Sequence, residues 1–460
     1  MLLGSYRAPA EDDPAYSLAA DRVPPAVAEV RRLPPVDIPD PPKPRELGPQ
    51  RETLEEAWAI ALSADRVLQS KQWGVSSAQY ALQSAQAQRW PTAAIEGSYT
   101  VRSDEQSLRF TMPGVPLPFD SLPLTQNESF AFRGLVDLPL YTSGRIGAGI
   151  EAAGARLSSA ALDVEEAKLD LRLRVAERYV MVLRAEREVE VAQCTVSSLE
   201  SHYRDAELLY KHEQVPQNDL LAAQVALSDA RQKEIQARNL LDICRAEYNR
   251  GLGRPLDAPV QLAELQPETR DDDLDGLTAQ AIRERPVLAG LSMQAQALQA
   301  QAESVRAKNG PQVALRGEYA FEENRYRTPE GIAGAGVGMT WNLFDGGRYR
   351  HEAAALMHQA ESTRRLLCDL QSRIALEVRR AGLDIRQTRQ RLQVTPEAIQ
   401  RAEENLRVAR KRYVAGVGTS TEVLDAEMLR VQARRNRDHA LCDAVLAELR
   451  LRHATAELRR

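Results

Sequence analysis

An internal duplication constrains this chain more than any other feature of its sequence. Residues 140–145, Leu-Tyr-Thr-Ser-Gly-Arg, match residues 343–348, Leu-Phe-Asp-Gly-Gly-Arg, at an offset of 203 positions. The same offset joins Tyr210 to Tyr413, Leu221 to Leu424, Ala223 to Ala426 and Ala230 to Ala433. Upstream, residues 91–99 match residues 311–319 at an offset of 220, which places a 17-residue length change in the loop between. Chance does not keep a fixed offset on both sides of one length change, so the chain contains two copies of one unit.

Apolar residues recur at every seventh position through much of both copies. The rows are Val175, Val182, Val189, Val196, Tyr203 and Tyr210 in the first copy, and Val378, Ile385, Leu392, Ile399, Leu406 and Tyr413 in the second. Because 203 is 29 × 7, both copies keep one heptad register. Such spacing indicates helices packed as left-handed coiled coils. Residues 146–212 contain no proline and predict one helix of ~100 Å, far longer than a globular domain needs.

Four short segments alternate apolar and polar residues with a period of two. They are residues 95–102, 130–137, 313–322 and 335–343, two in each copy. The alternation predicts strands with one apolar face, each about as long as a tilted strand that crosses a bilayer. Half-buried hairpins of a soluble domain would show the same alternation. Four such strands and helices of ~100 Å cannot share one compact core, and this favours the membrane interpretation.

The composition excludes several classes of protein. A length of 460 residues would suggest about three globular domains, but the duplication indicates one repeated unit instead. Lys and Arg total 60 against 65 Asp and Glu, so the chain lacks the basic excess of a nucleic-acid binder, and we expect no nucleic-acid partner. No run of 18 or more uncharged apolar residues occurs, which excludes a helical membrane span and does not exclude a span of strands.

The chemistry-bearing residues are scattered, and we predict neither an enzyme nor a cofactor. The cysteines form no CxxC pair and no disulfide framework; they are Cys194, Cys244, Cys368 and Cys442. His351 and His358 share a helical face, but no carboxylates join them, so we expect no metal site. Gly334, Gly336 and Gly338 make a loose glycine run that lies within a predicted strand, where small-residue packing is the better interpretation. We find no pair of nucleophile and base.

Prolines divide the chain into segments. Residues 1–50 hold 11 of the 25 prolines and are expected to be extended or disordered. We expect the first repeat at residues 51–250, opening with one helix to about Arg89 and followed by two strands and a long helical hairpin. A proline-rich and acidic linker would span 251–275, the second repeat 276–456, and a short tail 457–460.

The first residues contain the run Leu2-Leu3-Gly4-Ser5, which looks like the end of a lipoprotein signal with Ser5 in place of the lipidated cysteine. A start site that omits the true signal and a chance match both explain it.

Three motifs and their duplication resemble the TolC-type outer-membrane efflux proteins. They are Leu-Phe-Asp-Gly-Gly-Arg at 343–348, Arg-Tyr-Val-Ala-Gly at 412–416 and Val-Leu-Asp-Ala-Glu at 423–427. The resemblance covers about residues 50–456. It implies a mainly α fold with a small transmembrane β part. Three copies would each give four strands to one 12-stranded barrel in outer-membrane lipid, with the helices continuing as a hollow cylinder across the periplasm and the linker forming an equatorial belt.

The resemblance also implies a function and partners. The protein would be the outer-membrane channel of a tripartite efflux or secretion system in a Gram-negative-type bacterium. It would open by an iris-like movement of its periplasmic helix tips. This movement would follow the docking of a periplasmic adaptor protein and of an inner-membrane pump of the resistance-nodulation-division or ABC type. A four-stranded sheet has open edges that lipid cannot satisfy, which agrees with closure by other copies. A polar lumen explains the charged strand residues Arg102, Arg133, Arg316 and Glu318.

The tips of the helical hairpins are expected near residues 211–219 and 414–422. Glu422 and Asp425 lie on one helical face and match the acidic aperture positions of the family. Threefold symmetry would turn them into carboxylate rings that favour cations. Two solvated acids at a helix start, favoured by the helix dipole, are the alternative.

The resemblance assigns further tip residues. Tyr413 and Asp219 match a family link that ties the inner tip to its neighbour, although Tyr413 also closes a heptad row and could serve in core packing. Gly418 stands where some members carry an arginine that bonds the position of Asn218, which puts that second link in doubt. Glu213 replaces the tip glycine that the second copy keeps as Gly416, so the first tip is expected to be built differently. The adaptor would contact Lys211, His212, Glu213, Gly416 and Gly418.

Two other classes remain as alternatives. A periplasmic coiled-coil adaptor without a channel would need lipoyl-like and β-barrel domains rich in glycine turns, and neither is apparent. A soluble coiled-coil scaffold would not need four alternating strands or the glycine-rich residues 331–338.

Overall fold

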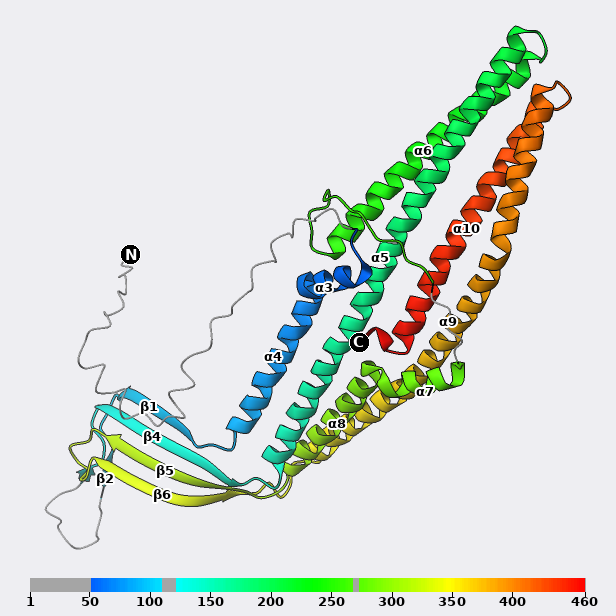
Figure 1. The fold of residues 1–460 in the computed structure, drawn as a ribbon. Helices are drawn as coiled ribbons and strands as arrows, with labels where there is room; N and C mark the ends of the chain where they lie inside the picture. The colour runs from blue at the N-terminus through cyan, green and yellow to red at the C-terminus, as the bar shows by residue number, and fades with distance from the viewer. Residues whose placement is uncertain (1–50, 110–120, 268–272, 460) are drawn as a thin grey trace, which may run out of the picture. The chain divides into compact units, whose positions relative to one another are not determined.

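The computed structural model describes residues 51–109, 121–267 and 273–459. The proline-rich segment expected at 1–50 lies outside the described residues, as do parts of the first inter-strand loop and of the linker, and residue 460. The first copy contains α3 (Leu54–Ala64), α4 (Arg66–Ala87), β1 (Thr92–Val101), β2 (Ser107–Arg109), β3 (Ser121–Pro123), β4 (Glu128–Tyr141), α5 (Arg145–Lys211) and α6 (Gln217–Gly251). The second contains α7 (Leu274–Glu284), α8 (Pro286–Ala307), β5 (Gln312–Glu322), β6 (Gly331–Thr340), α9 (Arg348–Val414), α10 (Ser420–Ala454) and the short η2 (Glu457–Arg459) (Figure 1).

The helices repeat in length as well as in order. In both copies the helix after the sheet has 67 residues and the returning helix 35, and the two helices before the sheet have 11 and 22. The single helix predicted up to Arg89 is therefore wrong. It breaks at Asp65, whose carboxylate accepts a hydrogen bond from Leu68 N at 2.7 Å and so begins a new helix.

Four antiparallel strands form one sheet in the order β1-β4-β5-β6 (Figure 1). The junction between the copies is the β4–β5 pair. The four predicted strands are observed, but the last begins at Gly331 and ends at Thr340. The next residue, Trp341, donates a hydrogen bond from its indole to Asn309 O at 3.1 Å, at the end of α8 rather than along β5. A small β2–β3 hairpin in the first inter-strand loop was not predicted.

The sheet has one apolar and one polar face. The register places Ile95 opposite Gly134, Gly134 opposite Tyr319, and Tyr319 opposite Ala333, so these residues share the apolar face. This face is not covered within the described chain: Ile95 is 76% exposed and Met339 66%. An apolar face of this size needs to be covered, and the described residues do not cover it.

Each long helix begins directly after the sheet at a glycine in the left-handed conformation. Gly144 has a φ of 87° and Gly347 a φ of 83°, and residues with a Cβ rarely adopt such values. The connection from the sheet to the long helix therefore ends in the same left-handed glycine in both copies.

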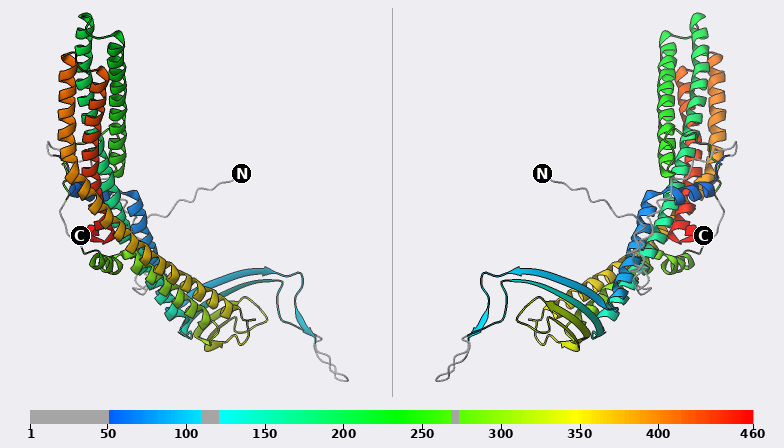
Figure 2. Two further views of the ribbon diagram at one scale, coloured as in Figure 1. Left: turned by 90° about the vertical axis from the view of Figure 1, so that its right-hand side faces the viewer. Right: turned by 90° about the vertical axis from the view of Figure 1, so that its left-hand side faces the viewer.

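The long helices form two hairpins, α5 with α6 and α9 with α10, and α10 also packs on α5 (Figures 1 and 2). The predicted heptad positions Val175, Val182, Val378 and Leu406 are buried. The largest apolar cluster lies where α3 and the C-terminal part of α10 pack on α5.

A network of charges joins α5, α9 and α10 to the junction of α7 and α8 near the base of the hairpins, and its two basic members, Arg285 and His453, are buried. Arg285, between α7 and α8, lies 2.7 Å from Glu166 of α5, and its side chain is 7% exposed. His453 of α10 lies 2.9 Å from Asp170 of α5 and 3.3 Å from Glu377 of α9. Burial lowers the pKa of His453, but the hydrogen bonds to Asp170 and Glu377 outweigh it and raise the pKa above its usual value.

We predict that this network makes the stability of the helical part depend on pH. Because the folded pKa of His453 lies above the unfolded value of about 6.5, its contribution is complete below that pH and is lost as the pH rises through the folded pKa. The midpoint of thermal helix loss, followed by circular dichroism, should fall over this window. His453→Gln should remove this component of the pH dependence, and identical profiles for the two proteins would contradict the assignment.

Candidate functional site

The two hairpin tips, residues 212–216 and 415–419, have the same backbone hydrogen bonds. Glu213 N donates to Tyr210 O at 2.9 Å, and Gly416 N donates to Tyr413 O at 3.0 Å. The next amides, of residues 214 and 417, donate to the carbonyls of residues 209 and 412. Glu213 adopts a φ of 54° where Gly416 has 75°. The backbone of the first tip is therefore built like that of the second, because Glu213 adopts at some cost the left-handed conformation that Gly416 adopts freely. The tips do differ where the next helix begins, since Thr419 caps α10 through its side chain and Pro216 makes no such bond to α6.

Gly418 is held close to the helix that precedes it. A Cβ at this position would lie 3.1 Å from Cβ of Arg412 and 3.1 Å from the amide nitrogen of Tyr413. A side chain here, such as the arginine expected from the resemblance, would therefore require the neighbouring atoms of Arg412 and Tyr413 to shift. Asn218, the residue that this arginine would bond, is exposed.

The acidic positions of the second tip are exposed, and one of them has a basic partner. Thr419 caps α10 by accepting a hydrogen bond from Glu422 N at 3.3 Å. The Glu422 carboxylate lies 3.2 Å from Nη1 of Arg412, while Asp425 faces solvent one turn on. Arg412, which we did not predict as a site residue, therefore offsets part of the negative charge of this tip.

Tyr413 is 1% exposed and closes an apolar cluster with Leu406, Ala409 and Val423. Its hydroxyl makes no hydrogen bond within the described residues, and Asp219 is half-buried. Burial, and next the negative charge of Asp219, raise the pKa of Tyr413. The packing role is thus observed, and the two partners of the predicted link lie close enough to interact electrostatically without a hydrogen bond within this chain.

The remaining tip residues are on the surface. Lys211 lies 3.1 Å from Glu207, one turn earlier on α5, and His212 ends that helix. Lys211, His212, Glu213 and Gly416 are all exposed, so a partner that approaches the tips can reach them.

Sequence reasoning missed a set of buried polar residues just behind the tips. His202 and Ser198 of α5 meet Ser420 and Glu427 of α10, and Arg410 of α9 also reaches Ser198. The heptad rows gave no signal for them, because the rows follow α5 and α9, where Ser198, His202 and Arg410 lie outside the row positions, and do not cover α10. The spacings of four residues from Ser198 to His202 and seven from Ser420 to Glu427 could have shown that each pair shares one helical face.

The charged strand residues lie together on the polar face of the sheet. Arg133 lies 2.9 Å from Glu318, and Arg316 lies 3.5 Å from Asp137. Arg102, just beyond β1, donates to Ser129 Oγ at 3.0 Å. Since the opposite face is apolar, the four predicted residues mark the side of the sheet that prefers water.

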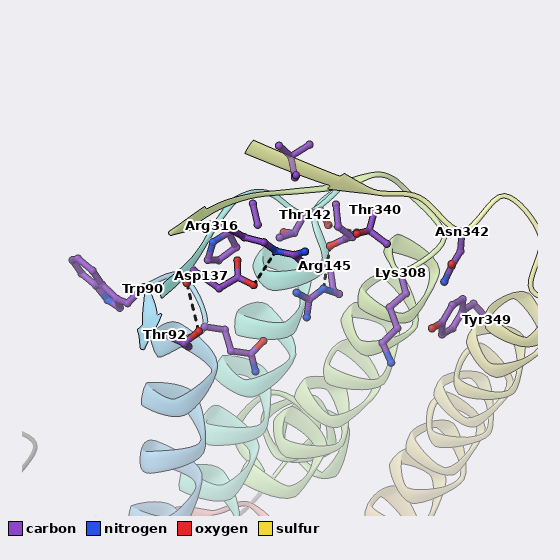
Figure 3. A pocket seen from close by; sticks show the side chains of 16 residues that line it. Trp90, Thr92, Asp137, Thr142, Arg145, Lys308, Arg316, Thr340, Asn342 and Tyr349 are labelled. Carbon is purple, nitrogen blue, oxygen red and sulfur yellow. Dashed lines mark hydrogen bonds and ion pairs between the residues drawn. The ribbon is translucent and has the colours of Figure 1, made fainter. Parts of the chain in front are cut away.

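A polar recess of about 620 Å³ lies where this face meets the helices (Figure 3). Arg145, Lys308 and Arg316 line it together with Asp137 and the ring of Tyr349. The recess is open, and its excess of cations makes this part of the polar surface positive.

The described residues contain no group of three or more His, Cys, Asp or Glu side chains that could hold a metal ion. Among the helices in the described ranges, none combines the length and apolar character that a membrane span requires.

Comparisons with known proteins give one consistent match. The family model described as outer membrane efflux protein matches residues 59–254 and 277–457. The alkaline protease secretion protein AprF of Pseudomonas aeruginosa is 24% identical over 295 residues, or 62% of this chain. The match spans 60% of the length of AprF.

Solved structures share the fold. The outer membrane protein VceC from Vibrio cholerae superposes with a TM-score of 0.74 at 17% identity, covering 87% of this chain and 95% of VceC. The CmeC outer membrane channel of Campylobacter jejuni superposes with a TM-score of 0.75 at 13% identity, covering 87% and 85%.

The strained first tip yields a prediction. A left-handed conformation costs a residue with a side chain roughly 1–2 kcal/mol, and glycine returns part of this through its greater freedom when unfolded. Glu213→Gly should therefore stabilise the first tip by up to about 1 kcal/mol, which corresponds to about fivefold slower amide hydrogen exchange there. Gly416→Ala, the matched change in the second tip, should speed exchange there. Unchanged exchange in both variants would show that neither tip bears the strain.

Proposed function

The chain belongs to the outer membrane efflux protein family, and we propose that three copies form the outer-membrane duct of a tripartite efflux or secretion system. The observation that carries this proposal is the four-stranded sheet with an uncovered apolar face, set directly before helices of 67 residues. The outer edges of β1 and β6 pair with no other strand among the described residues. Unpaired backbone groups are prohibitively costly in lipid, so the sheet needs neighbouring copies on both edges.

The helices also favour an assembly of copies. Large apolar side chains remain exposed along α6 and α9, the outer helices of the two hairpins. They include Leu221, Val225, Ile235, Leu240 and Ile243 on α6, and Leu366, Leu376, Leu383, Val394 and Val408 on α9. Since α5 already packs against α10 within the chain, the duplication predicts the equivalent contact, of α9 with α6 of the next copy. Six hairpins arranged in this way would form a closed cylinder.

The polar face of the sheet would line the lumen of the barrel. Ion pairs such as Arg133–Glu318 and the positive recess at Arg145 and Lys308 offer no closed binding cavity, so cargo would be selected by size and charge. We include both small molecules and proteins as cargo, because AprF is by its name a protein of alkaline protease secretion.

The rival classes fit the structure less well. A soluble scaffold would not expose an apolar sheet face with strands of ten or more residues. A periplasmic adaptor would need compact domains in place of this sheet, and the described residues form none.

The gate would lie at the hairpin tips. Glu422 and Asp425 would form acidic rings around the aperture, and Tyr413, Asp219 and Asn218 would hold the tips inward. A periplasmic adaptor would bind at Lys211, His212, Glu213, Gly416 and Gly418, and a pump of the inner membrane would complete the path. The exposure of both tips supports this arrangement.

We predict that Asp219→Ala and Tyr413→Phe each raise the resting conductance of the protein in planar bilayers. Each removes one partner of the Tyr413–Asp219 contact, which is electrostatic and has no hydrogen bond in this structure, so we take its contribution as about 1 kcal/mol. The open fraction should then rise about fivefold. Tyr210→Phe is the matched control, because Tyr210 is the counterpart of Tyr413 in the first copy and is 39% exposed.

Unchanged conductance in both gate variants would contradict the gating assignment. A protein that inserts into bilayers but conducts no ions in any variant would contradict the channel itself.

A further inference from the structure

A buried polar contact joins the two hairpins of one chain just behind their tips. Its members, called the hairpin seam below, are Ser198, His202, Arg410, Tyr413, Ser420 and Glu427. They come from α5, α9 and α10. Any movement of the α9–α10 hairpin relative to α5 must break these contacts.

The layer of the seam nearest the tips centres on His202. Its Nε2 lies 3.0 Å from Ser420 Oγ, and its ring centroid lies 5.0 Å from that of Tyr413. All three side chains are 1% exposed. The imidazole thus holds the first residue of α10 and the last turn of α9 at once.

The second layer lies one helical turn further back. The Ser198 hydroxyl donates to Glu427 Oε2 at 2.8 Å, and Arg410 donates to Ser198 O at 2.8 Å. Arg430 pairs with the other oxygen of Glu427. In this layer Arg430 compensates the charge of the Glu427 carboxylate, which is 3% exposed.

His202 has no such compensation. The groups that face it are Arg410 and Tyr413 of α9 and Ser420 of α10, with Ser198 on its own helix. Asp205 of α5 and Asp219 of α6 act on Tyr413 behind it. Burial, followed by the positive charge of Arg410, lowers the pKa of His202 to about 4.

The sign of the pH effect follows from this shift. In the closed seam His202 is neutral, whereas an opened seam returns it to water and to a pKa of about 6.5. The seam is therefore fully favoured above pH 6.5 and loses this stabilisation as the pH falls toward 4. A difference of this size changes the ratio of closed to open seams by on the order of a hundredfold.

The pH-dependent contact of His202 with Ser420 has no equivalent in the other half of the duplication. At the offset of 203, the counterparts of His202 and Ser420 are Asn405 and Gln217. Both are exposed in the single chain, as expected at edges where α9 and α6 would meet other copies. Neither titrates, so the proposed contacts between copies lack the proton switch.

We propose that His202 is a positioning residue of the gate, which holds the α9–α10 hairpin against α5 while neutral and releases it when protonated. The inference rests on the proposed channel function and deepens it. Acidification of the periplasmic side would thereby favour the open duct without adaptor or pump.

The test is the resting conductance of the purified full-length protein in planar bilayers at pH 7.5 and pH 4.5. Wild-type conductance should rise at pH 4.5 by at least tenfold. His202→Gln keeps a neutral hydrogen-bonding group at both pH values, so its rise should be at least fivefold smaller. The acidic residues Glu422, Asp425 and Asp219 are present in both proteins, so the difference between the two isolates His202. His358→Gln, which changes an exposed histidine of α9, should behave as wild type.

Two further variants keep the inference falsifiable if His202→Gln does not assemble. Ser420→Ala removes the partner of the imidazole and should raise conductance already at pH 7.5, and His202→Asn should reproduce His202→Gln. An equal pH response in wild type and His202 variants, or no effect of Ser420→Ala, would overturn the inference while leaving the channel intact. Absence of conductance in every protein, including Tyr413→Phe, would instead overturn the proposed function.

Discussion

The backbone of the sheet imposes the constraint on which the rest of the structure depends. Four antiparallel strands leave two open edges, and their apolar face has no cover within the described chain. Water could satisfy the edges but not the apolar face, and lipid could cover the face but not the edges. Closure with further copies in a membrane satisfies both at once. The 67-residue helices begin within a few residues of β4 and β6, so the proposed closed barrel would continue into them.

The duplication makes the two halves similar in backbone, and the side chains make them different in role. Helix lengths, tip hydrogen bonds and the glycine turn after the sheet repeat between copies. The seam behind the tips does not repeat, since His202 and Ser420 correspond to Asn405 and Gln217. The contact within one chain is therefore polar and buried, while its counterpart stays open for another copy. This difference in side chains allows the two hairpins to respond unequally to the same change in pH, as a gate requires.

Much of the fold was predictable, because it depends on periodic patterns. Period two located the four strands, period seven located the long helices, and the fixed offset showed that they form two equivalent sets. The break at Asp65 was missed, because the Asp65 side chain begins a new helix through one local hydrogen bond and does not change the spacing of the apolar residues. The residues of the candidate site were harder to predict from the sequence. Arg412 and His202 act through partners distant in sequence, and the strain at Glu213 depends on a backbone angle that composition does not reveal.

We propose that the open sheet closes only by association of three copies in a membrane. The most direct measurement is the mass of the particle extracted from the outer membrane in detergent, determined by native mass spectrometry. We expect extraction to require detergent and the particle to have three times the 51.1 kDa of one chain. A particle of one chain that remains soluble without detergent would contradict the account.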